Sequence, residues 1–171
     1  MTTRYFNDLL RKIQDGDTSA IEPIFSAYYN SMCFSAWWTV RNKQDAEDVA
    51  SEAVVKIIGY AQKPNHAYVK DAGAFIYTLV KNTALDFLRK NSRTAPLDKD
   101  IPFEQDDGLE KAAVYDAMRL LSDSEFKIAE MFYYYDCKIK EIAKQLDMTV
   151  SAVKYHLGEI RKKLYKILKT D

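Results

Sequence analysis

The chain has 171 residues, of which 47% are hydrophobic and 29% are charged, with few glycines and prolines. This composition favours a folded, mostly helical protein over a disordered chain, because enough apolar side chains are available for a core. Lys and Arg together number 25, as do Asp and Glu, and this balance argues against a protein that coats nucleic acid regardless of sequence.

The residue patterns indicate neither secretion nor catalysis. The N-terminus is polar and no run of about 18 apolar residues occurs, so we expect a cytoplasmic protein without a signal peptide or a membrane span. Cys33 and Cys137 form no CxxC pair, and we expect both to be buried, reduced thiols. No nucleophilic triad is visible, so we expect no enzymatic activity, no cofactor and no metal site.

Three helical stretches are predicted in the first half of the chain by apolar residues at three-and-four spacing, at about residues 8–40, 45–62 and 73–91. The second stretch places its apolar residues on one face: Ala46, Val49, Ala50, Ala53, Ile57 and Ile58. Proline, asparagine and glycine mark residues 63–73 as a loop. This half of the chain is therefore expected to form a bundle of three to four helices.

A segment rich in acidic residues and proline follows the third stretch. Residues 95–108 show no helical apolar period and carry five carboxylates against one lysine. We therefore expect an all-α protein of two small helical domains, residues 1–94 and 109–171, joined by this acidic linker.

The second domain has well-marked helix boundaries in its sequence. One helix is predicted at 109–121. Ser122 and Glu125 then form a capping box, S-x-x-E, that opens another helix running to about Tyr135.

The rest of this domain predicts a helix-turn-helix. A short helix at 138–146 is followed by a turn, where Asp147 tolerates the left-handed backbone conformation, and by a long helix that begins at a Thr149 cap. The positions expected to be buried between the two helices are Ile142, Ala143, Leu146, Met148, Val150, Val153, Leu157 and Ile160.

This helix-turn-helix is expected to bind DNA. From Lys138 to the end of the chain, nine Lys or Arg residues oppose four Asp or Glu residues. The exposed residues near the start of the long helix are the ones that enter a major groove. We expect DNA contacts from Ser151, Ala152, Lys154, Tyr155 and His156, with Lys154 and Tyr155 foremost. The alternative is a helical hairpin whose outer face is merely solvated.

Three stretches of the chain resemble, in the same order, motifs of the extracytoplasmic-function sigma factors. QDAEDVASEAVVKII (44–58) resembles the family's polymerase-binding helix, and GAFIYTLVKNTALDFLRKNSR (73–93) resembles its promoter-melting helix with an N-x-x-x-D-x-x-R core. The helix-turn-helix resembles the domain that recognises the minus-35 element. The matching residues are Asp45, Ala46, Glu47, Asp48 and Glu52 in the first motif, and Asn82, Asp86 and Arg89 in the second. The resemblance implies a transcription initiation factor with core RNA polymerase and promoter DNA as partners.

The resemblance implies that the helix at 45–62 docks on the clamp of the polymerase's largest subunit. Opposite its core face lies an acidic, partly apolar strip, which suits a basic partner helix. The residues expected to bind polymerase are Asp45, Glu47, Asp48, Glu52 and Val55. The acidic linker is implied to enter a basic channel of the polymerase, since DNA phosphates would repel it.

The third helical stretch and the loop before it are expected to contact the minus-10 element. A polar-to-basic stripe that includes Thr78 and Asn82 suits phosphates and separated single strands. In the family the loop captures a flipped base, whereas the alternative here is a simple surface connector. The residues expected to contact DNA are Asn65, His66, Tyr68, Tyr77, Lys81, Asn82, Arg89, Lys90 and Arg93.

The same residues are compatible with two other functions. A stand-alone helix-turn-helix repressor or activator would bind an operator without polymerase, but this function leaves the first domain unexplained. A metal-dependent phosphohydrolase would require Glu47, Asp48 and Glu52 to hold magnesium with carboxylates from a second helix, and the third stretch offers only Asp86. An anti-sigma factor is a further candidate partner, which the sequence leaves undecided.

Overall fold

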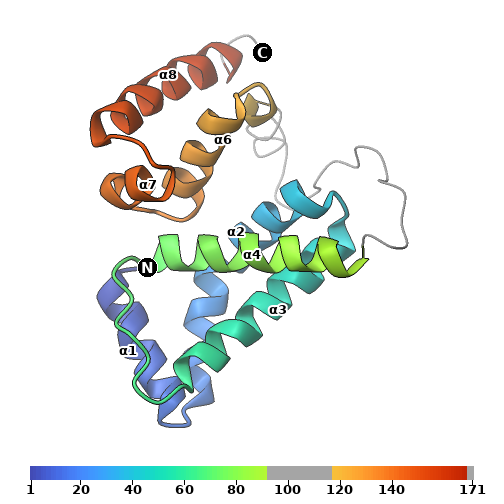
Figure 1. Cartoon of the computed structure of the whole chain (residues 1–171), viewed down its shortest axis with the longest axis vertical. Helices are drawn as coiled ribbons and strands as arrows, with labels where there is room; N and C mark the ends of the chain where they lie inside the picture. Colours follow the sequence, from blue (N-terminus) through green and yellow to red (C-terminus); the bar gives the residue numbers. More distant parts are fainter. Residues whose placement is uncertain (92–116, 169–171) are drawn as a thin grey trace. The chain divides into compact units, whose positions relative to one another are not determined.

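The computed structural model describes residues 1–91 and 117–168, and every regular element in these two ranges is a helix (Figure 1). The chain divides into two compact units, Met1–Phe103 and Glu104–Asp171. The expected all-α fold with two helical domains is therefore confirmed.

Part of the expected organisation lies outside the described residues: the acidic linker at 95–108, Arg93, and most of the helix expected at 109–121. The domain boundaries expected at these positions stay predictions. Within the described part of the chain, no helix is both long enough and apolar enough to cross a membrane.

The first unit begins with two helices where the sequence predicted a single stretch at 8–40. These elements are α1 (Thr3–Gln14), the 3-10 turn η1 (Thr18–Ala20) and α2 (Ile21–Val40). The helical path is interrupted at Gly16, whose φ of 92° is a conformation that glycine adopts at little cost. The Asp17 side chain then accepts a hydrogen bond from the Ser19 backbone N–H and opens the 3-10 turn. The prediction of one continuous helical stretch at 8–40 was therefore wrong, because the spacing of apolar residues alone does not reveal such an interruption.

The next two helices, α3 (Lys43–Ala61) and α4 (Ala72–Asn91), lie within two residues of their predicted positions. The turn before α3 is set by Arg41, which closes α2 in the left-handed conformation with φ 58°. The Asn42 side chain accepts from the Asp45 N–H at 3.0 Å, and the Asp71 side chain accepts from the Ala74 N–H at 2.9 Å. Each helix thus begins at a side-chain cap.

The core of the first unit is formed by all four of its α-helices. In α3, four alanines (Ala46, Ala50, Ala53 and Ala61) are fully buried, and these small side chains allow neighbouring helices to approach closely. Helix α4 packs on both α2 and α3 (Figure 1). The large residues that fill this core include Phe6, Leu10, Ile24, Met32, Trp37, Ile57 and Ile76.

The second unit has the helix order that the sequence predicted. Its elements are α6 (Asp123–Ala129), the π-helix η2 (Glu130–Tyr134), α7 (Ile139–Gln145) and α8 (Val150–Leu168). The capping box between Ser122 and Glu125 is present in full. Asp147 has a φ of 52°, as the turn requires, and Thr149 Oγ1 accepts from the Ala152 N–H at 3.1 Å. These local predictions are confirmed.

Polar contacts of Lys163 and Arg161 join α8 to the rest of the second unit. Lys163 Nζ donates to both carboxylate oxygens of Glu125, at 2.6 and 2.8 Å, although the Glu125 side chain is only 8% exposed. These hydrogen bonds, with those from Ser122, lower the pKa of Glu125 to about 2. Arg161 Nε donates to the Tyr133 hydroxyl at 3.3 Å. The C-terminal half of α8 is therefore held to the start of α6 and to η2.

Both cysteines are buried and neither forms a disulfide bond, as expected. Cys33 lies in α2, where burial raises the pKa of its thiol to about 11. Cys137 lies between η2 and α7 in the other unit. Neither thiol is therefore placed as an exposed, reactive nucleophile.

Candidate protein and nucleic-acid interfaces

The outer face of α3 has the acidic and partly apolar character that the sequence predicted. Asp48, Ser51 and Val55 are exposed, and Val55 is 64% exposed despite its apolar side chain. On the opposite side Val49 and Ile57 are buried. An exposed valine among carboxylates is the kind of surface that a protein partner covers.

One of the predicted acidic residues has a partner within the fold. Glu52 is 3.0 Å from Lys56 Nζ, which also donates to Thr83 Oγ1 on α4 at 3.0 Å. Glu47 and Asp48 are exposed, whereas Asp45 is half-buried in the first turn. Asp48 is therefore better placed than Glu52 to meet a partner. Among the described residues, no group of three or more His, Cys, Asp or Glu side chains is arranged to hold a metal ion.

An aromatic pair on α2 extends this surface, and the sequence analysis missed it. Phe25 stacks on Tyr29 with ring centroids 4.2 Å apart, and Phe25 is 42% exposed. Tyr29 is hydrogen-bonded to Ser51 of α3, and partial burial raises the pKa of Tyr29. The only signal in the sequence was the spacing of four residues between two aromatic side chains. We call Phe25, Tyr29 and the outer face of α3 the α2–α3 surface.

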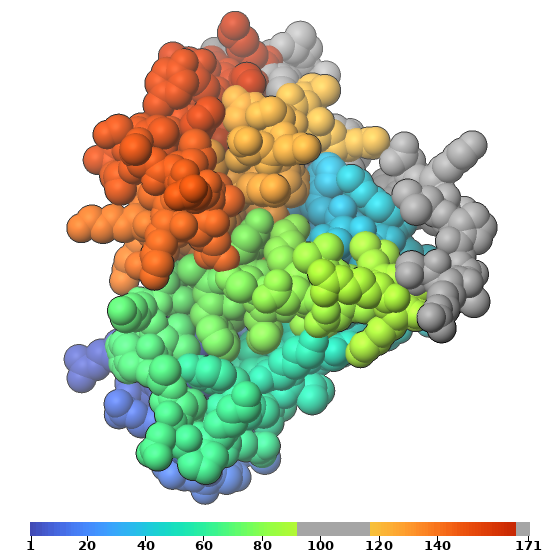
Figure 2. Space-filling view, viewed as in Figure 1, coloured from blue at the N-terminus to red at the C-terminus, as the bar shows by residue number. Residues whose placement is uncertain are grey.

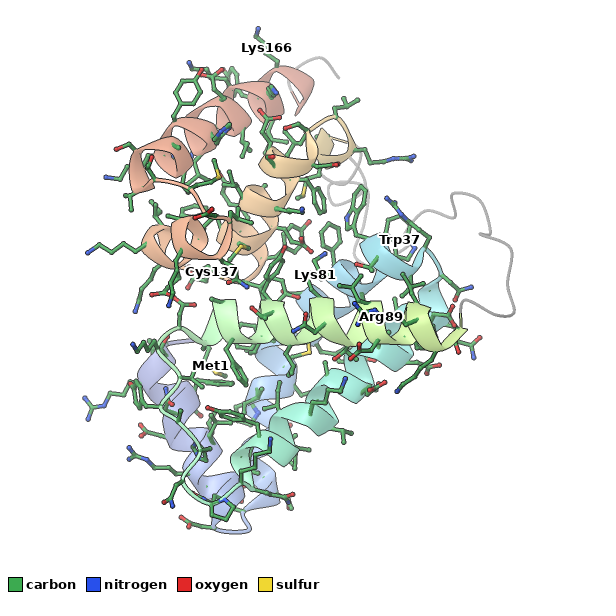
Figure 3. The ribbon with its side chains drawn as sticks, viewed as in Figure 1. Met1, Trp37, Lys81, Arg89, Cys137 and Lys166 are labelled. Atoms are coloured by element: carbon green, nitrogen blue, oxygen red, sulfur yellow. The ribbon has the colours of Figure 1, made fainter. Side chains whose placement is uncertain are left out.

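The polar stripe of α4 is present, with a composition different from the prediction. Thr78, Asn82 and Arg89 are exposed along one side of the helix, and Lys90 is exposed beside them. Leu85, which is 46% exposed, lies between Asn82 and Arg89 at helical spacing, and the sequence analysis missed it. Figure 2 shows that α4 presents one side to the surface, and Figure 3 shows Lys81 and Arg89 on this helix.

Two residues expected beside this stripe lie elsewhere. Tyr77 is only 6% exposed, because it shares the helix face of the buried residues Val80 and Ala84. Lys81 is half-buried, and its Nζ donates to the Ser35 carbonyl oxygen at 3.3 Å and lies 5.5 Å from the Tyr77 ring centre. The expected exposure beside the stripe is therefore wrong for Tyr77, whereas for the half-buried Lys81 a contact with DNA stays a prediction.

The loop between α3 and α4 presents two of its three predicted side chains. Asn65 is exposed with a φ of 57°, and the His66 N–H donates to the Lys63 carbonyl at 3.3 Å, which makes a tight turn. Tyr68 is 58% exposed. His66 instead packs its ring 5.4 Å from the Tyr60 ring, and its Nδ1 atom is buried. Asn65 and Tyr68 are therefore the side chains that a nucleotide would meet first.

The helix-turn-helix exposes the expected side chains at the start of α8. Ser151 and Lys154 are exposed and Tyr155 is 66% exposed, while Ala152 and His156 are half-buried. Of the positions expected to be buried, five are buried (Ile142, Ala143, Val153, Leu157 and Ile160) and three are half-buried (Leu146, Met148 and Val150). The first turns of α8 can therefore enter a groove while its apolar face stays packed.

Comparison with known protein families finds two matches along the chain. Sigma-70 region 2 matches residues 24–94, and sigma-70 region 4 matches residues 111–164. A comparison with curated proteins finds no match. The first match contains the α2–α3 surface and α4, and the second contains the helix-turn-helix.

Solved structures similar to this chain are also found. CnrH, solved in complex with the cytosolic domain of CnrY, aligns with a TM-score of 0.58 and 18% identity over 95% of this chain and 96% of that chain. A chain of the RsbN–BldN complex aligns with a TM-score of 0.40 and 18% identity over 92% of this chain and 98% of that chain. The likeness to CnrH shows a shared fold.

Proposed function

The chain belongs to the sigma-70 family, and we propose that it directs core RNA polymerase to promoters through contacts with their minus-10 and minus-35 elements. The observation that carries the proposal is the pairing of two different exposed surfaces. The residues that match region 2 carry an exposed acidic and aromatic surface and the polar stripe of α4, and those that match region 4 carry a helix-turn-helix whose long helix exposes Lys154 and Tyr155 near its start.

Core polymerase is proposed to bind the α2–α3 surface. Asp48 supplies a charge for a basic partner helix, and Val55 supplies apolar area that becomes buried on binding. The stacked rings of Phe25 and Tyr29 add the rigid aromatic area that is common at the energetic centre of an interface. The exposed residues named on this surface are acidic, apolar or aromatic, so we propose that it binds protein rather than DNA.

The minus-10 element is proposed to bind α4 and the loop before it. Arg89 and Lys90 supply charge for phosphates, and Asn82 supplies an amide for an unstacked base. Arg89 lies 3.3 Å from Asp86 within the helix, and a phosphate would compete for this guanidinium. In the loop, Tyr68 offers an aromatic face for stacking, which suits the capture of a base that has left the duplex.

The minus-35 element is proposed to bind the first turns of α8. Lys154 and Tyr155 protrude where a recognition helix meets base edges and phosphates, and Ser151 lies one turn before them. The hydrogen bonds from Arg161 and Lys163 hold the far half of the same helix on the domain. A rigid helix loses little conformational entropy when it binds, which favours discrimination between sequences.

Other proteins are proposed to regulate the factor through the region 2 surface. CnrH was solved with the cytosolic domain of a second protein, and we extend this mode of control to the present chain as an anti-sigma factor that covers the α2–α3 surface. Such a partner would compete with polymerase. In this proposal the protein acts in the cytoplasm and has no catalytic activity of its own.

The test is transcription from a promoter library by core polymerase, with and without this protein. We expect transcripts from a defined subset of promoters only when the protein is present. Gel-shift assays with the same promoters should show tight binding only with core polymerase. Binding of the isolated protein to an operator, without any effect on promoter choice by the polymerase, would instead support a stand-alone helix-turn-helix regulator.

A further inference from the structure

Helix α1 holds the loop between α3 and α4 through hydrogen bonds to the loop backbone. At one end of the loop, Gln14 Nε2 donates to the Lys63 carbonyl oxygen at 3.2 Å. At the other end, Thr3 Oγ1 accepts from the Ala72 N–H at 3.2 Å. The helix and the loop therefore run in opposite directions, so that the start of α1 faces the end of the loop.

The central contact comes from Asn7, a polar residue that is only 3% exposed. Its Oδ1 accepts from the Val69 N–H at 2.9 Å, and its Nδ2 donates to the Val69 carbonyl oxygen at 2.9 Å. The same Nδ2 also donates to the Thr3 carbonyl at 2.8 Å. One amide thus satisfies both backbone polar groups of Val69, as a neighbouring strand would.

A second anchor reaches the same loop from α3. The Tyr60 hydroxyl donates to the Ala67 carbonyl oxygen at 2.6 Å, and the Tyr60 ring packs against His66. Between these fixed points Asn65 and Tyr68 are exposed. The anchors therefore constrain the loop backbone while the two side chains proposed to meet DNA stay accessible.

We propose that α1 is a positioning element for promoter recognition, and that Asn7 sets the minus-10 preference through the shape of the loop without touching DNA. The inference rests on the proposed function, because it requires the loop to contact the minus-10 element. It adds a role for α1, a helix that precedes the residues matched by sigma-70 region 2. A loop that is already ordered loses less conformational entropy when it captures a base. It also rejects bases that a mobile loop would adapt to.

Asn7 is separable from the packing of α1 on the core. The apolar face of α1 is buried through Phe6, Leu10 and Ile13, which are distinct from the residues that bond to the loop. Replacing Asn7 by leucine keeps a similar volume and removes all three hydrogen bonds of its amide. The expected consequence is a freer loop on an otherwise folded unit.

The experiment compares wild type with Asn7→Leu in holoenzyme made from the full chain and core polymerase. Minus-10 selection is measured from a promoter library with a constant minus-35 element, and amide hydrogen exchange is measured at Val69 and Ala72. We expect Asn7→Leu to assemble holoenzyme normally, to exchange these two amides faster, and to lose about tenfold in discrimination between minus-10 bases, a change of about 1.4 kcal/mol. Asn7→Asp keeps the acceptor for the Val69 N–H but loses the donor, and its discrimination should fall between the two.

The matched control is Asp8→Asn, which changes the next residue of α1, an exposed carboxylate 3.8 Å from Arg11. Its selection profile should equal that of wild type. Should Asn7→Leu fail to fold, the double variant Thr3→Val with Gln14→Leu decides the question, since it removes the two end contacts and is expected to lose about threefold in discrimination.

The outcomes separate this inference from the function on which it rests. A wild-type protein that gives no promoter preference with core polymerase contradicts the proposed function, and the positioning role with it. A wild-type preference that survives unchanged in the folded variant contradicts the positioning role alone. Equal losses of base discrimination at the minus-10 and minus-35 elements would also contradict the positioning role. Such a result is what general destabilisation of the protein would produce.

Discussion

The two regions proposed to contact promoter DNA are specified in different ways. The helix-turn-helix is built from short-range signals: a capping box at Ser122, a left-handed turn residue at Asp147 and a cap at Thr149. The loop before α4 instead takes its shape from Asn7, 62 residues away from its partner Val69. The comparison shows that a backbone conformation set by neighbouring residues can be predicted from sequence, whereas a contact between distant residues, such as that of Asn7 with Val69, cannot.

The largest expected effect is a loss of affinity for core polymerase at the α2–α3 surface, which is distinct from the two regions proposed to contact DNA. Asp48→Arg with Val55→Arg places two positive charges on the α2–α3 surface, where a basic partner helix is proposed to bind. Affinity for core polymerase, measured by titration of labelled core, should fall at least about a hundredfold, because opposed like charges at an interface cost several kcal/mol. The thermal stability should be retained, since both positions are exposed.

The control for this pair is Asp15→Arg, a charge reversal at an exposed residue at the end of α1. It should leave the affinity for core polymerase unchanged. Normal holoenzyme assembly by the Asp48→Arg, Val55→Arg variant would show that polymerase binds elsewhere on the chain.

The next largest effect concerns the helix-turn-helix, which is proposed to contact the minus-35 element. Lys154→Glu replaces an attraction to phosphates or bases with a repulsion at the start of α8, and the loss should be about 1–3 kcal/mol, the value of one good contact. In promoter-selection profiles, dependence on the minus-35 element should disappear while the minus-10 preference persists. Lys127→Glu, at an exposed position on α6, provides the charge-matched control. A profile that keeps its minus-35 dependence would exclude Lys154 from this contact.

A smaller effect on stability is expected from the contact that holds α8. Lys163→Met removes both hydrogen bonds to Glu125 but keeps the capping box, and should lower the free energy of unfolding by about 1–2 kcal/mol. Urea titration measures this change. Lys162→Met is the control, because Lys162 pairs with Glu159 on the exposed side of the same helix. Equal stabilities of the two variants would mean that the contact with Glu125 contributes nothing.

The same contact predicts a dependence of stability on pH. The pKa of Glu125 falls from 4.5 to about 2 in the folded protein, so the unfolded chain binds more protons between these values. The stabilisation is fully present above about pH 4.5 and is lost as the pH falls toward 2. The slope of the unfolding free energy against pH over this interval should be smaller for Lys163→Met than for wild type.

The smallest expected effect concerns Tyr77 of α4. Tyr77 is buried, so Tyr77→Phe should change minus-10 selection by less than about twofold, which is within about 0.4 kcal/mol. Asn82→Ala, at an exposed position on the stripe, should reduce selection measurably in the same assay. A larger effect of Tyr77→Phe than of Asn82→Ala would mean that the Tyr77 hydroxyl reaches DNA in the holoenzyme.

Much of this protein was determined by its sequence alone. The helix class, the order of the helices in the second unit and the caps at Ser122 and Thr149 depend on residues within a few positions of one another, and a periodic apolar face is visible wherever one side of a helix is buried. The division of α3 into a core face and an acidic outer face was predicted for the same reason.

Only the tertiary structure decided which side chains are available at these surfaces. Tyr77 and Lys81 carry the right chemistry for DNA, but packing buries the first and directs the second to the Ser35 carbonyl. Asn7 looks like an ordinary polar residue of an amphipathic helix until the fold brings the loop against it. Exposure and long-range hydrogen bonds depend on which helices meet, and no local pattern of residues contains that information.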